Sequence, residues 1–337
     1  MISEHLDYYR GKRVLLTGAG YVGAAIVRLL ARVECEIVVL RRPSALVIPQ
    51  HIGHATLIDR PRGYGERSAW ADAVAGVSAI FHLAAQTGGR QAENDWTADY
   101  AASVAPLALM LEACRAADSR PAVVFASSAT VMGSPARLPA SESDPVQPYG
   151  VYEIHKLLGE SYLRHAVSEG RVRGTALRIP NVYGPGPVAS SGERGVLNLI
   201  ARAAIETGRI NVYGDGRMLR DFLFVDDVAA AFLAVPARLD SIKLAAYLLG
   251  SGQPITLVDA FRAVAGSVER IAGRPVTISH IAPPAEARPI DFRSFHADAS
   301  AFRDATGWRR TIDFDTGITR TVQAIHGASA QARSWPQ

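Results

Sequence analysis

The chain carries serine, tyrosine and lysine side chains whose types and spacing suit proton transfer. Ser127 and Ser128 follow the apolar run Ala122 to Phe125, which is typical of a buried strand. Tyr152 and Lys156 stand four residues apart in a helical pattern, so both lie on one helix face. An ammonium beside a phenol favours the phenolate, so Tyr152 could protonate a carbonyl oxygen or deprotonate a hydroxyl.

The same stretch assigns the three catalytic roles. Tyr149 lies nearby, but the residue one helical turn later is Glu153 rather than a lysine, so Tyr152 is the better candidate. Ser128 could hold the substrate oxygen that Tyr152 serves. Lys156 could also hydrogen-bond the ribose of a nicotinamide cofactor.

A glycine-rich turn near the start of the chain could bind that cofactor. The run Arg13 to Thr17 predicts a buried strand, and a helical pattern extends from the turn to about Val33. A G-x-G-x-x-G turn between strand and helix lets backbone N–H groups and the helix dipole meet a pyrophosphate. A turn kept for packing alone is the alternative. The contacts expected here come from Gly18, Gly20, Tyr21, Val22 and Gly23.

The end of the second predicted strand, Glu36 to Leu40, bears on the choice between NADP and NAD. An acidic residue at this place accepts hydrogen bonds from the adenosine ribose, whereas arginine suits a 2′-phosphate. The sequence has Arg41 and Arg42 and no carboxylate. It therefore favours NADPH, with NADH as the alternative, unless these arginines form only an exposed basic loop.

Two further residues could touch the cofactor. Asp59 ends the predicted strand Ala55 to Ile58 and could reach the adenine, although it could equally cap a loop. Ala84 follows the predicted strand Ala79 to Leu83, where a small residue permits close approach of the cofactor. His82 lies inside that apolar run and is more consistent with a core histidine than with a catalyst.

The alternation of strands and helices predicts an α/β fold with a Rossmann-type doubly wound parallel sheet. One long helix is expected near Ala98 to Ala117, and further strands and helices follow up to the C-terminus. Residues 1–180 are expected to form the dinucleotide-binding domain, rejoined by about 217–245. Residues 181–330 are expected to form a smaller substrate-binding lobe.

Composition limits the class of protein. The 337 residues are 48% hydrophobic and 20% charged, which is enough for a large core. No apolar run approaches the roughly eighteen residues of a membrane span, and no basic run with interleaved aromatics indicates nucleic-acid binding. The two cysteines, Cys35 and Cys114, cannot form a disulfide framework or a metal cluster. The first ten residues lack an apolar signal region, so the expectation is a cytoplasmic protein without a metal.

Several stretches in combination carry a family resemblance. They are Phe81-His-Leu-Ala-Ala, Ser127-Ser-Ala-Thr-Val, Tyr152-Glu-Ile-His-Lys, Asn181-Val-Tyr-Gly-Pro-Gly, and Tyr213-Gly-Asp-Gly with Arg220-Asp-Phe. On these stretches the chain, from Val14 to about Trp308, resembles the extended short-chain dehydrogenase/reductase family of nucleotide-sugar epimerases, dehydratases and ketoreductases.

The resemblance implies a nucleotide-sugar substrate, the catalytic roles given above and often a homodimer. By the family pattern, the nucleotide diphosphate is expected to contact Asn181, Asn198, Arg220 and Arg288. The later part of the chain is most similar to the 4-ketoreductases of antibiotic deoxysugar pathways. Those enzymes reduce a dTDP-4-keto-6-deoxyhexose with NADPH.

The chain departs from the family pattern at three places. The glycine loop is one residue shorter than the usual T-G-x-x-G-x-x-G, Ser103 stands where many members have asparagine, and Met132 replaces a common tyrosine. Dehydratases of the family carry an acidic pair just after the site serine, where this chain has Ala129 and Thr130. Dehydration is therefore not expected.

The main hypothesis from the sequence is NADPH-dependent reduction of the C4 ketone of a nucleotide-linked 4-keto-6-deoxyhexose. An NAD(P)-dependent nucleotide-sugar 4-epimerase is the first alternative, since it would use the same side chains. A non-catalytic NADP-binding sensor and a reductase of steroid or flavonoid ketones are more remote. A sensor has no need of an acid, and a steroid offers Arg220 and Arg288 no diphosphate.

Overall fold

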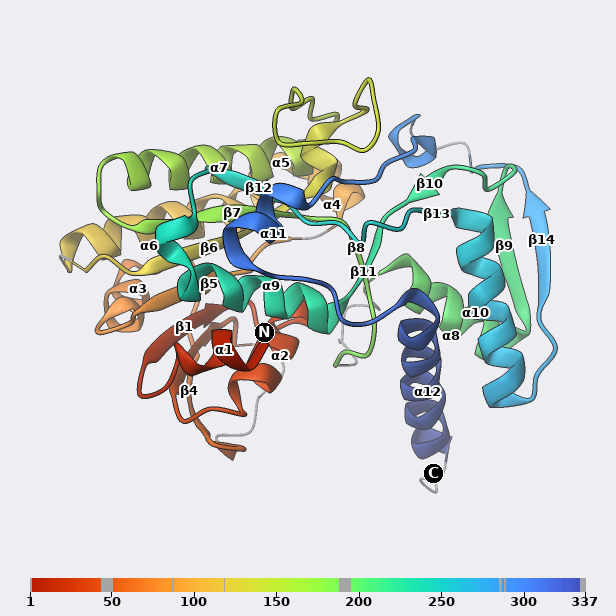
Figure 1. The fold of residues 1–337 in the computed structure, drawn as a ribbon, viewed down its shortest axis with the longest axis horizontal. Helices are drawn as coiled ribbons and strands as arrows, with labels where there is room; N and C mark the ends of the chain where they lie inside the picture. The colour runs from red at the N-terminus through yellow and green to blue at the C-terminus, as the bar shows by residue number, and fades with distance from the viewer. Residues whose placement is uncertain are drawn as a thin grey trace.

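A predominantly parallel β-sheet with helices on both faces forms the larger part of the molecule, and a smaller lobe lies beside it (Figure 1). The computed structural model describes residues 2–43, 51–86, 88–117, 119–187, 195–284, 287 and 289–333. Its strands are β1 (Arg13–Thr17), β2 (Glu36–Arg41), β3 (His51–Ile52), β4 (Ala55–Pro61), β5 (Ala79–His82), β6 (Ala122–Ser128), β7 (Arg173–Ile179), β8 (Asn181–Tyr183), β9 (Arg209–Tyr213), β10 (Leu219–Arg220), β11 (Phe222–Phe224), β12 (Ala246–Leu248), β13 (Ile255–Thr256) and β14 (Thr277–Ile281).

Helices of the described residues connect and cover these strands. They are α1 (Ile2–Asp7), α2 (Tyr21–Leu30), α3 (Arg67–Val74), α4 (Gly89–Asn94), α5 (Trp96–Ser103), α6 (Ala105–Ala116), α7 (Val151–Ser168), α8 (Val196–Thr207), α9 (Val225–Ala237), α10 (Leu257–Ala272), α11 (Ser300–Thr306) and α12 (Phe314–Arg333). Short 3-10 turns are η1 (Ala129–Met132), η2 (Leu239–Ser241) and η3 (Pro289–Phe292).

The main sheet confirms the predicted doubly wound architecture. Its order is β12-β7-β6-β5-β1-β2-β4-β3, and all of its pairings are parallel except the short edge strand β3 against β4. The chain moves outward in one direction from β1 through β2 and in the other from β5 through β6. The carboxyl ends of β1 and β5 therefore flank the point where the strand order reverses, which is where ligands bind in such sheets.

Alternation along β1 shows how the sequence produces the two helical layers. Val14 and Leu16 belong to the hydrophobic cluster that contains α2 and α9, whereas Leu15 belongs to the cluster that contains α3, α6 and α7. Successive strand residues point to opposite faces, so a run of apolar residues is buried on both sides.

The predicted long helix near residues 98–117 is wrong in one respect. The structure has two helices there, α5 and α6, with Val104 between them. Pro106 occupies the first turn of α6, where its missing N–H is tolerated, whereas the interior of a continuous helix would lose a hydrogen bond there.

The smaller lobe is built from α8, α10 and α12 with short strand pairs. β9 pairs with β14, and β10 pairs with β13 (Figure 1). The segments of the smaller lobe are not continuous in sequence. Between them the chain returns to the unit built on the main sheet, where α9 packs on α2 and β12 pairs with β7. The helices in the described part of the chain include none long and apolar enough to cross a bilayer.

Candidate functional site

The glycine turn after β1 packs as the motif requires. A Cβ on Gly23 would lie 2.5 Å from the Gly18 carbonyl oxygen, and one on Gly18 would lie 2.7 Å from the Ala84 nitrogen. Gly18 also has a φ of 76°, which favours glycine. A Cβ on Gly20, by contrast, would meet no protein atom within 4 Å. Gly18 and Gly23 therefore close the turn, and Gly20 faces open space.

The first turn of α2 has the properties of a phosphate site. Gly20 is its N-cap residue, and the structure shows no side-chain hydrogen bond at this cap among the described residues. Backbone N–H groups at a helix start then remain available to an anion, and the helix dipole favours its charge. The turn thus fits the pyrophosphate of a dinucleotide, with Val22 half-buried behind it.

Tyr64, which the sequence analysis did not identify, braces this turn. Its hydroxyl accepts the Gly18 N–H at 3.1 Å and donates to the Leu40 carbonyl at 3.2 Å. Its ring stacks on Trp70, whose indole N–H donates to the Tyr64 carbonyl. Tyr64 lies in a loop without periodicity, so no pattern in the sequence could have singled it out.

Tyr21 connects the cofactor turn to the chain segment that enters the smaller lobe. Its hydroxyl donates to the Gly184 carbonyl at 2.6 Å and accepts from Asn198 Nδ2 at 3.3 Å. The Asn198 amide also bonds the Gly184 carbonyl and N–H, at 2.8 and 3.2 Å. A side chain on Gly186 would collide with the Tyr21 ring. Both ends of the Asn198 amide are thus engaged within the protein, and its contact with substrate stays a prediction.

Arg41 and Asp59, both predicted to touch the cofactor, pair with each other, and their contacts with a cofactor stay predictions. Arg41 Nε and Nη2 donate to the two Asp59 carboxylate oxygens at 2.7 and 2.6 Å. Only 5% of the Arg41 side chain is exposed, and its Nη1 bonds the carbonyls of Arg42 and Pro43. Opposite charges on adjacent strands satisfy each other, and the fork of the guanidinium matches a carboxylate. The case for NADP is therefore weakened, since only Arg42 of the two arginines is exposed.

Helix α7 brings Tyr152 and Lys156 to the end of β6. Lys156 Nζ donates to the Ala126 carbonyl at 2.7 Å and lies 5.7 Å from the centroid of the Tyr152 ring. A Cβ on Gly159 would lie 2.5 Å from Phe125, so this glycine lets the helix approach the strand closely. The predicted juxtaposition of the Tyr152–Lys156 helix with the serine-bearing strand is present.

Burial lowers the pKa of Lys156 to about 8, and the charges of Asp99 and Glu160 oppose that shift. The Lys156 side chain is buried, with the Phe125 ring 5.3 Å from its Nζ. Glu160 lies one helical turn beyond Lys156 and so shares the face of Tyr152. The sequence could have indicated Glu160 by this spacing.

The two serines at the end of β6 have different partners. Ser128 Oγ lies 2.8 Å from Thr130 Oγ1 and accepts the Thr130 N–H. Ser127 Oγ instead donates to Glu160 at 2.5 Å. Ser127 thus belongs to a buried network with Glu160, whereas Ser128 bonds only its neighbour Thr130 among the described residues, and its catalytic role stays a prediction.

Arg178 completes that network. Its Nε and Nη2 donate to the Glu160 carboxylate at 3.0 and 2.8 Å, and its Nη1 lies 3.1 Å from Met132 Sδ. A buried ion pair with its hydrogen bonds satisfied fixes geometry more than it adds stability. It holds β6, β7 and α7 together directly behind Lys156.

His82 is a core residue, as expected from its apolar run. It is fully buried, its Nδ1 lies 3.1 Å from Thr17 Oγ1, and its ring lies between those of Trp70 and Phe125. Burial, reinforced by the charge of Lys156, lowers its pKa to about 3. The imidazole therefore stays neutral and does not exchange protons at ordinary pH.

Three of the residues predicted to bind a nucleotide diphosphate, Asn181, Asn198 and Arg220, lie in and beside the smaller lobe. Arg220 Nη1 donates to the carbonyls of Leu219 and Arg293, and its Nη2 donates to the Asp291 carbonyl at 2.5 Å. Asn181 is exposed and its Nδ2 donates to the Asp221 carbonyl. Arg288 lies outside the described residues. Because β8 and β11 pair in parallel and Arg220 immediately precedes Asp221, Asn181 and Arg220 belong to one region.

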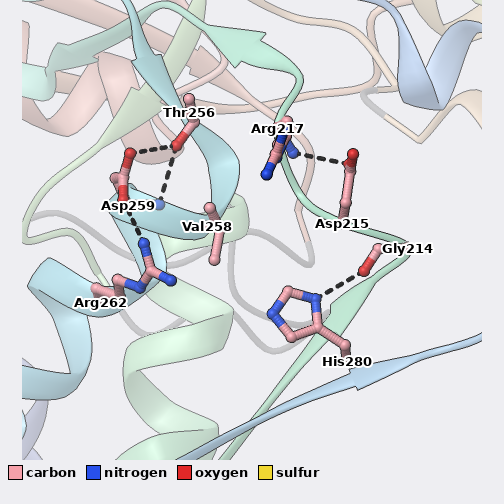
Figure 2. Close-up of a pocket in the computed structure, with 8 residues that line it drawn as sticks. All are labelled: Gly214, Asp215, Arg217, Thr256, Val258, Asp259, Arg262 and His280. Carbon is pink, nitrogen blue, oxygen red and sulfur yellow. Dashed lines mark hydrogen bonds and ion pairs between the residues drawn. The ribbon is translucent and has the colours of Figure 1, made fainter.

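The smaller lobe has a separate pocket with a volume of about 810 Å³. Figure 2 shows the residues that line it. Thr256, in its wall, pairs with Leu219 and so lies on the opposite face of the β10–β13 pair from Ile255, the partner of Arg220. Charged side chains of the pocket wall bond to one another. For example, Arg262 donates to Asp259 at 2.8 Å. None of the predicted site residues lines it. The lining residues are Gly214, Asp215, Arg217, Thr256, Val258, Asp259, Arg262 and His280.

The part of the chain that the structure describes holds no cluster of three or more histidine, cysteine or acidic residues that could bind a metal. Cys35 and Cys114 are buried free thiols, and burial raises their pKa values to about 11 and about 12. Neither thiol is suited to nucleophilic chemistry.

Known proteins share both the sequence pattern and the fold. The UDP-glucose 4-epimerase of Mycolicibacterium smegmatis is 30% identical over 250 residues, which cover 74% of this chain and 76% of that protein. The dTDP-L-rhamnose 4-epimerase of Burkholderia thailandensis is 28% identical over 76% of this chain and 81% of its own length.

A solved structure shares the fold of this chain. The Thermus thermophilus UDP-glucose 4-epimerase, in complex with NAD, is 28% identical and superposes with a TM-score of 0.78 over 94% of this chain and 99% of that one. The pattern described as the NAD dependent epimerase/dehydratase family matches residues 14–250. With its glycine turn, its Tyr152–Lys156 helix face and its doubly wound sheet in place, the chain is an enzyme of the extended short-chain dehydrogenase/reductase type and belongs to the NAD dependent epimerase/dehydratase family.

Proposed function

We propose that this chain is an NAD-dependent nucleotide-sugar 4-epimerase. The observation that carries the proposal is the position of the Lys156 ammonium, which donates to the Ala126 carbonyl of the strand that ends at Ser128 and lies 5.7 Å from the centroid of the Tyr152 ring. The relatives described above are named as 4-epimerases of UDP- and dTDP-sugars. The proposed substrate class is a UDP- or dTDP-linked hexose.

The proposed cofactor is NAD, held at the first turn of α2. Gly18, Gly20, Tyr21, Val22 and Gly23 are proposed to surround its pyrophosphate, with Lys156 at the nicotinamide ribose. The pairing of Arg41 with Asp59 supports NAD over NADPH, because that guanidinium is already matched by a carboxylate. The Thermus enzyme of the same fold is described with NAD.

A bound NAD, held at the first turn of α2 and by Lys156, would supply a reversible hydride acceptor for C4 of the sugar. The side chains of this protein would move the accompanying proton. Tyr152, beside the Lys156 ammonium, would take the proton of the C4 hydroxyl and later give it back. Ser128 would hold the same oxygen as its charge changes. Because the hydride and the proton both return to the sugar over one cycle, no external reductant is consumed.

Dehydration does not fit the residues that follow Ser128. Ala129 is buried and has no acid or base, and Thr130 is bonded to Ser128. The C4 ketoreductase predicted from the sequence is the weaker interpretation, because the named relatives are 4-epimerases and one of the two arginines that favoured NADPH, Arg41, is paired with Asp59. A reductase consumes one NADPH for each sugar, whereas an epimerase consumes none.

The nucleotide diphosphate is proposed to bind near Arg220 and Asn181, with Asn198 and Arg288 as further contacts. Burial lowers the pKa of Arg220, which nonetheless remains a cation at ordinary pH. The hydrogen bonds of its fork to the described residues go to carbonyl groups, which do not neutralise its charge.

A homodimer is proposed from one apolar face. Helices α5 and α7 pack together and expose large hydrophobic side chains, of which Trp96 is 64% and Ile154 is 45% exposed. A single cluster of this kind on adjacent helices is typical of an interface and is uncommon on a monomer. A second copy could cover it with the same face. The exposed members are Trp96, Tyr100, Ile154, Leu158 and Tyr162.

The test combines the purified protein with UDP-galactose, UDP-glucose, dTDP-linked hexoses and dTDP-4-keto-6-deoxyglucose. We expect the first three substrates to interconvert with their C4 epimers with no added cofactor or with NAD, and absorbance at 340 nm to stay constant. A further sample contains the keto sugar and NADPH. Stoichiometric loss of that NADPH, without interconversion of the other sugars, would establish the reductase instead. Bound NAD released by denaturation identifies the cofactor in the same preparation.

A further inference from the structure

Two hydroxyl groups lie side by side at the carboxyl end of β6. Ser128 Oγ and Thr130 Oγ1 are 2.8 Å apart, and either oxygen can be the donor of the hydrogen bond between them. The backbone N–H of Thr130 also donates to Ser128 Oγ, at 3.2 Å. Ser128 Oγ has no other hydrogen-bond partner in the described part of the chain, so the two side chains form one hydrogen-bonded pair.

The turn η1 holds this pair in one shape. Ser128 is the N-cap of η1, and Thr130 lies inside the turn. The residues on either side of Thr130, Ala129 and Val131, are buried. The turn closes where the Gly133 N–H donates to the Thr130 carbonyl at 3.0 Å. Because both neighbours of Thr130 are packed in the core, its hydroxyl stays beside Ser128.

The numbers of donors and acceptors decide what the pair can offer to a ligand. A hydroxyl group has one proton to donate and two lone pairs that accept. The Thr130 N–H fills one lone pair of Ser128 Oγ. If the Thr130 hydroxyl donates to Ser128, it fills the other lone pair, and Ser128 has only its O–H left for an outside partner. If Ser128 donates to Thr130 instead, Ser128 keeps no proton for a substrate.

The oxygen at C4 of a sugar needs a donor throughout the proposed reaction. It begins as a hydroxyl, gains negative charge as its proton leaves, and becomes the oxygen of a ketone, and in each state it accepts hydrogen bonds. A hydrogen bond to a charged oxygen is stronger than one to a neutral oxygen, so the loss of this donor affects the transition state more than substrate binding. The orientation in which Thr130 donates to Ser128 is the one that supplies the donor.

We propose that Thr130 is a positioning residue for the reaction, whose hydroxyl donates to Ser128 and so directs the Ser128 proton to the reacting oxygen. The inference rests on the proposed function, because it takes the role of Ser128 from it. Thr130 itself touches neither substrate nor cofactor in this role and acts through Ser128.

Thr130→Val tests the hydroxyl, because it keeps the branched shape of the side chain and the backbone N–H that bonds Ser128. We expect kcat for UDP-galactose to fall about tenfold, less than the loss of a direct oxyanion donor causes, and KM to change by less than about twofold. Thr130→Ser returns a hydroxyl to the same place and should restore kcat. If Thr130→Val does not fold, Thr130→Ala takes its place, with the same expected split between kcat and KM.

A double-mutant cycle separates this role from a structural one. Ser128→Ala removes the group through which Thr130 acts, so Thr130→Val should lower kcat no further in the Ser128→Ala background. A structural role for Thr130 does not depend on the Ser128 hydroxyl, and it would lower kcat by the same factor in both backgrounds. Thermal unfolding and the bound NAD of each variant measure whether the fold and the cofactor site are retained.

Thr207→Val is the matched control. Thr207 Oγ1 donates to the Ala203 carbonyl at 2.7 Å at the exposed end of α8, so the substitution removes a comparable hydrogen bond away from the pair. In this variant kcat should stay at the native value.

The failure of this inference can be told apart from the failure of the proposed function. The cycle is measured with UDP-galactose and, separately, with dTDP-4-keto-6-deoxyglucose and NADPH. Native kcat in Thr130→Val, or independent effects of the two substitutions on epimerisation, overturns the inference and leaves the epimerase intact. Coupled effects on reduction of the keto sugar, with no epimerisation, support the inference and contradict the proposed function.

Discussion

Lys156 Nζ lies 5.7 Å from the centroid of the Tyr152 ring while it donates a 2.7 Å hydrogen bond to the Ala126 carbonyl. The backbone of β6 therefore fixes the position of the ammonium, and the ammonium in turn lies beside the phenol. The proton chemistry of the site depends on the spacing between one helix and one strand.

The first prediction concerns Tyr152→Phe. Removing the hydroxyl deletes the acid and base but not the packing of the ring, so kcat should fall about 10²–10⁴-fold while bound NAD is retained. Epimerisation of UDP-galactose and the NAD content of the purified variant measure the two effects. Tyr149→Phe is the control, since Tyr149 is 58% exposed, and a similar loss in that variant would contradict the assignment.

The second prediction concerns the pH dependence of stability. Burial lowers the pKa of Lys156 from 10.5 to about 8, so between these values the unfolded chain binds more protons than the folded one. The stability contribution of Lys156 should therefore be lowest below about pH 8 and rise toward pH 10.5, by at most about 1.4 kcal/mol per pH unit. Urea unfolding of the native protein and of Lys156→Met across this range should show their difference changing with that sign. Parallel curves would show that the pKa of Lys156 is not lowered in the folded protein.

The third prediction separates two glycines of one turn. Gly20→Ala meets no protein atom, so it should fold at the cost of a weaker N-cap, about 1 kcal/mol or less, yet bind NAD at least about tenfold more weakly. Gly23→Ala would place a methyl 2.5 Å from the Gly18 carbonyl and should cost about 1–3 kcal/mol of stability. Thermal unfolding and NAD titration distinguish them. Equal effects of the two substitutions would argue against the open phosphate site.

The fourth prediction concerns Arg41. Arg41→Met would leave Asp59 without its partner, and it should destabilise the fold by about 1–3 kcal/mol. The ratio of NAD to NADP affinity should change little if the pair is structural. A large loss of NADP binding in the variant, measured by isothermal titration, would restore the cofactor preference predicted from the sequence.

The fifth prediction concerns the apolar face of α5 and α7. Leu158→Glu places a charge within the proposed interface and should convert a dimer to a monomer in light scattering. Leu199→Glu, at an equally apolar exposed position on α8, should leave the mass unchanged. A monomeric native protein would rule out the interface.

Much of the fold and of the proposed site could be predicted from local signals. The glycine turn, the Tyr152–Lys156 spacing and the core position of His82 each rest on neighbouring residues, and the structure has them as expected. Such patterns can be recognised in a single sequence because they follow from helix and strand periodicity.

The features that the sequence analysis missed are contacts between distant segments. The pairing of Arg41 with Asp59 was not foreseen, because the two residues lie eighteen positions apart on different strands. Asp99 and His155 lie 56 positions apart, and Tyr64 reaches Gly18 from an irregular loop. Strand order and helix packing decide such pairings, and a single sequence does not display them.

The hydrogen bonds that join Tyr21 to Gly184 and Asn198 have a mechanical consequence. Tyr21 begins the helix at the glycine turn, and Gly184 lies where the chain leaves the main sheet for the smaller lobe. Any movement of the smaller lobe away from this turn must break the 2.6 Å bond from the Tyr21 hydroxyl to the Gly184 carbonyl. A single phenol therefore makes the start of α2 and the entry to the smaller lobe move as one body.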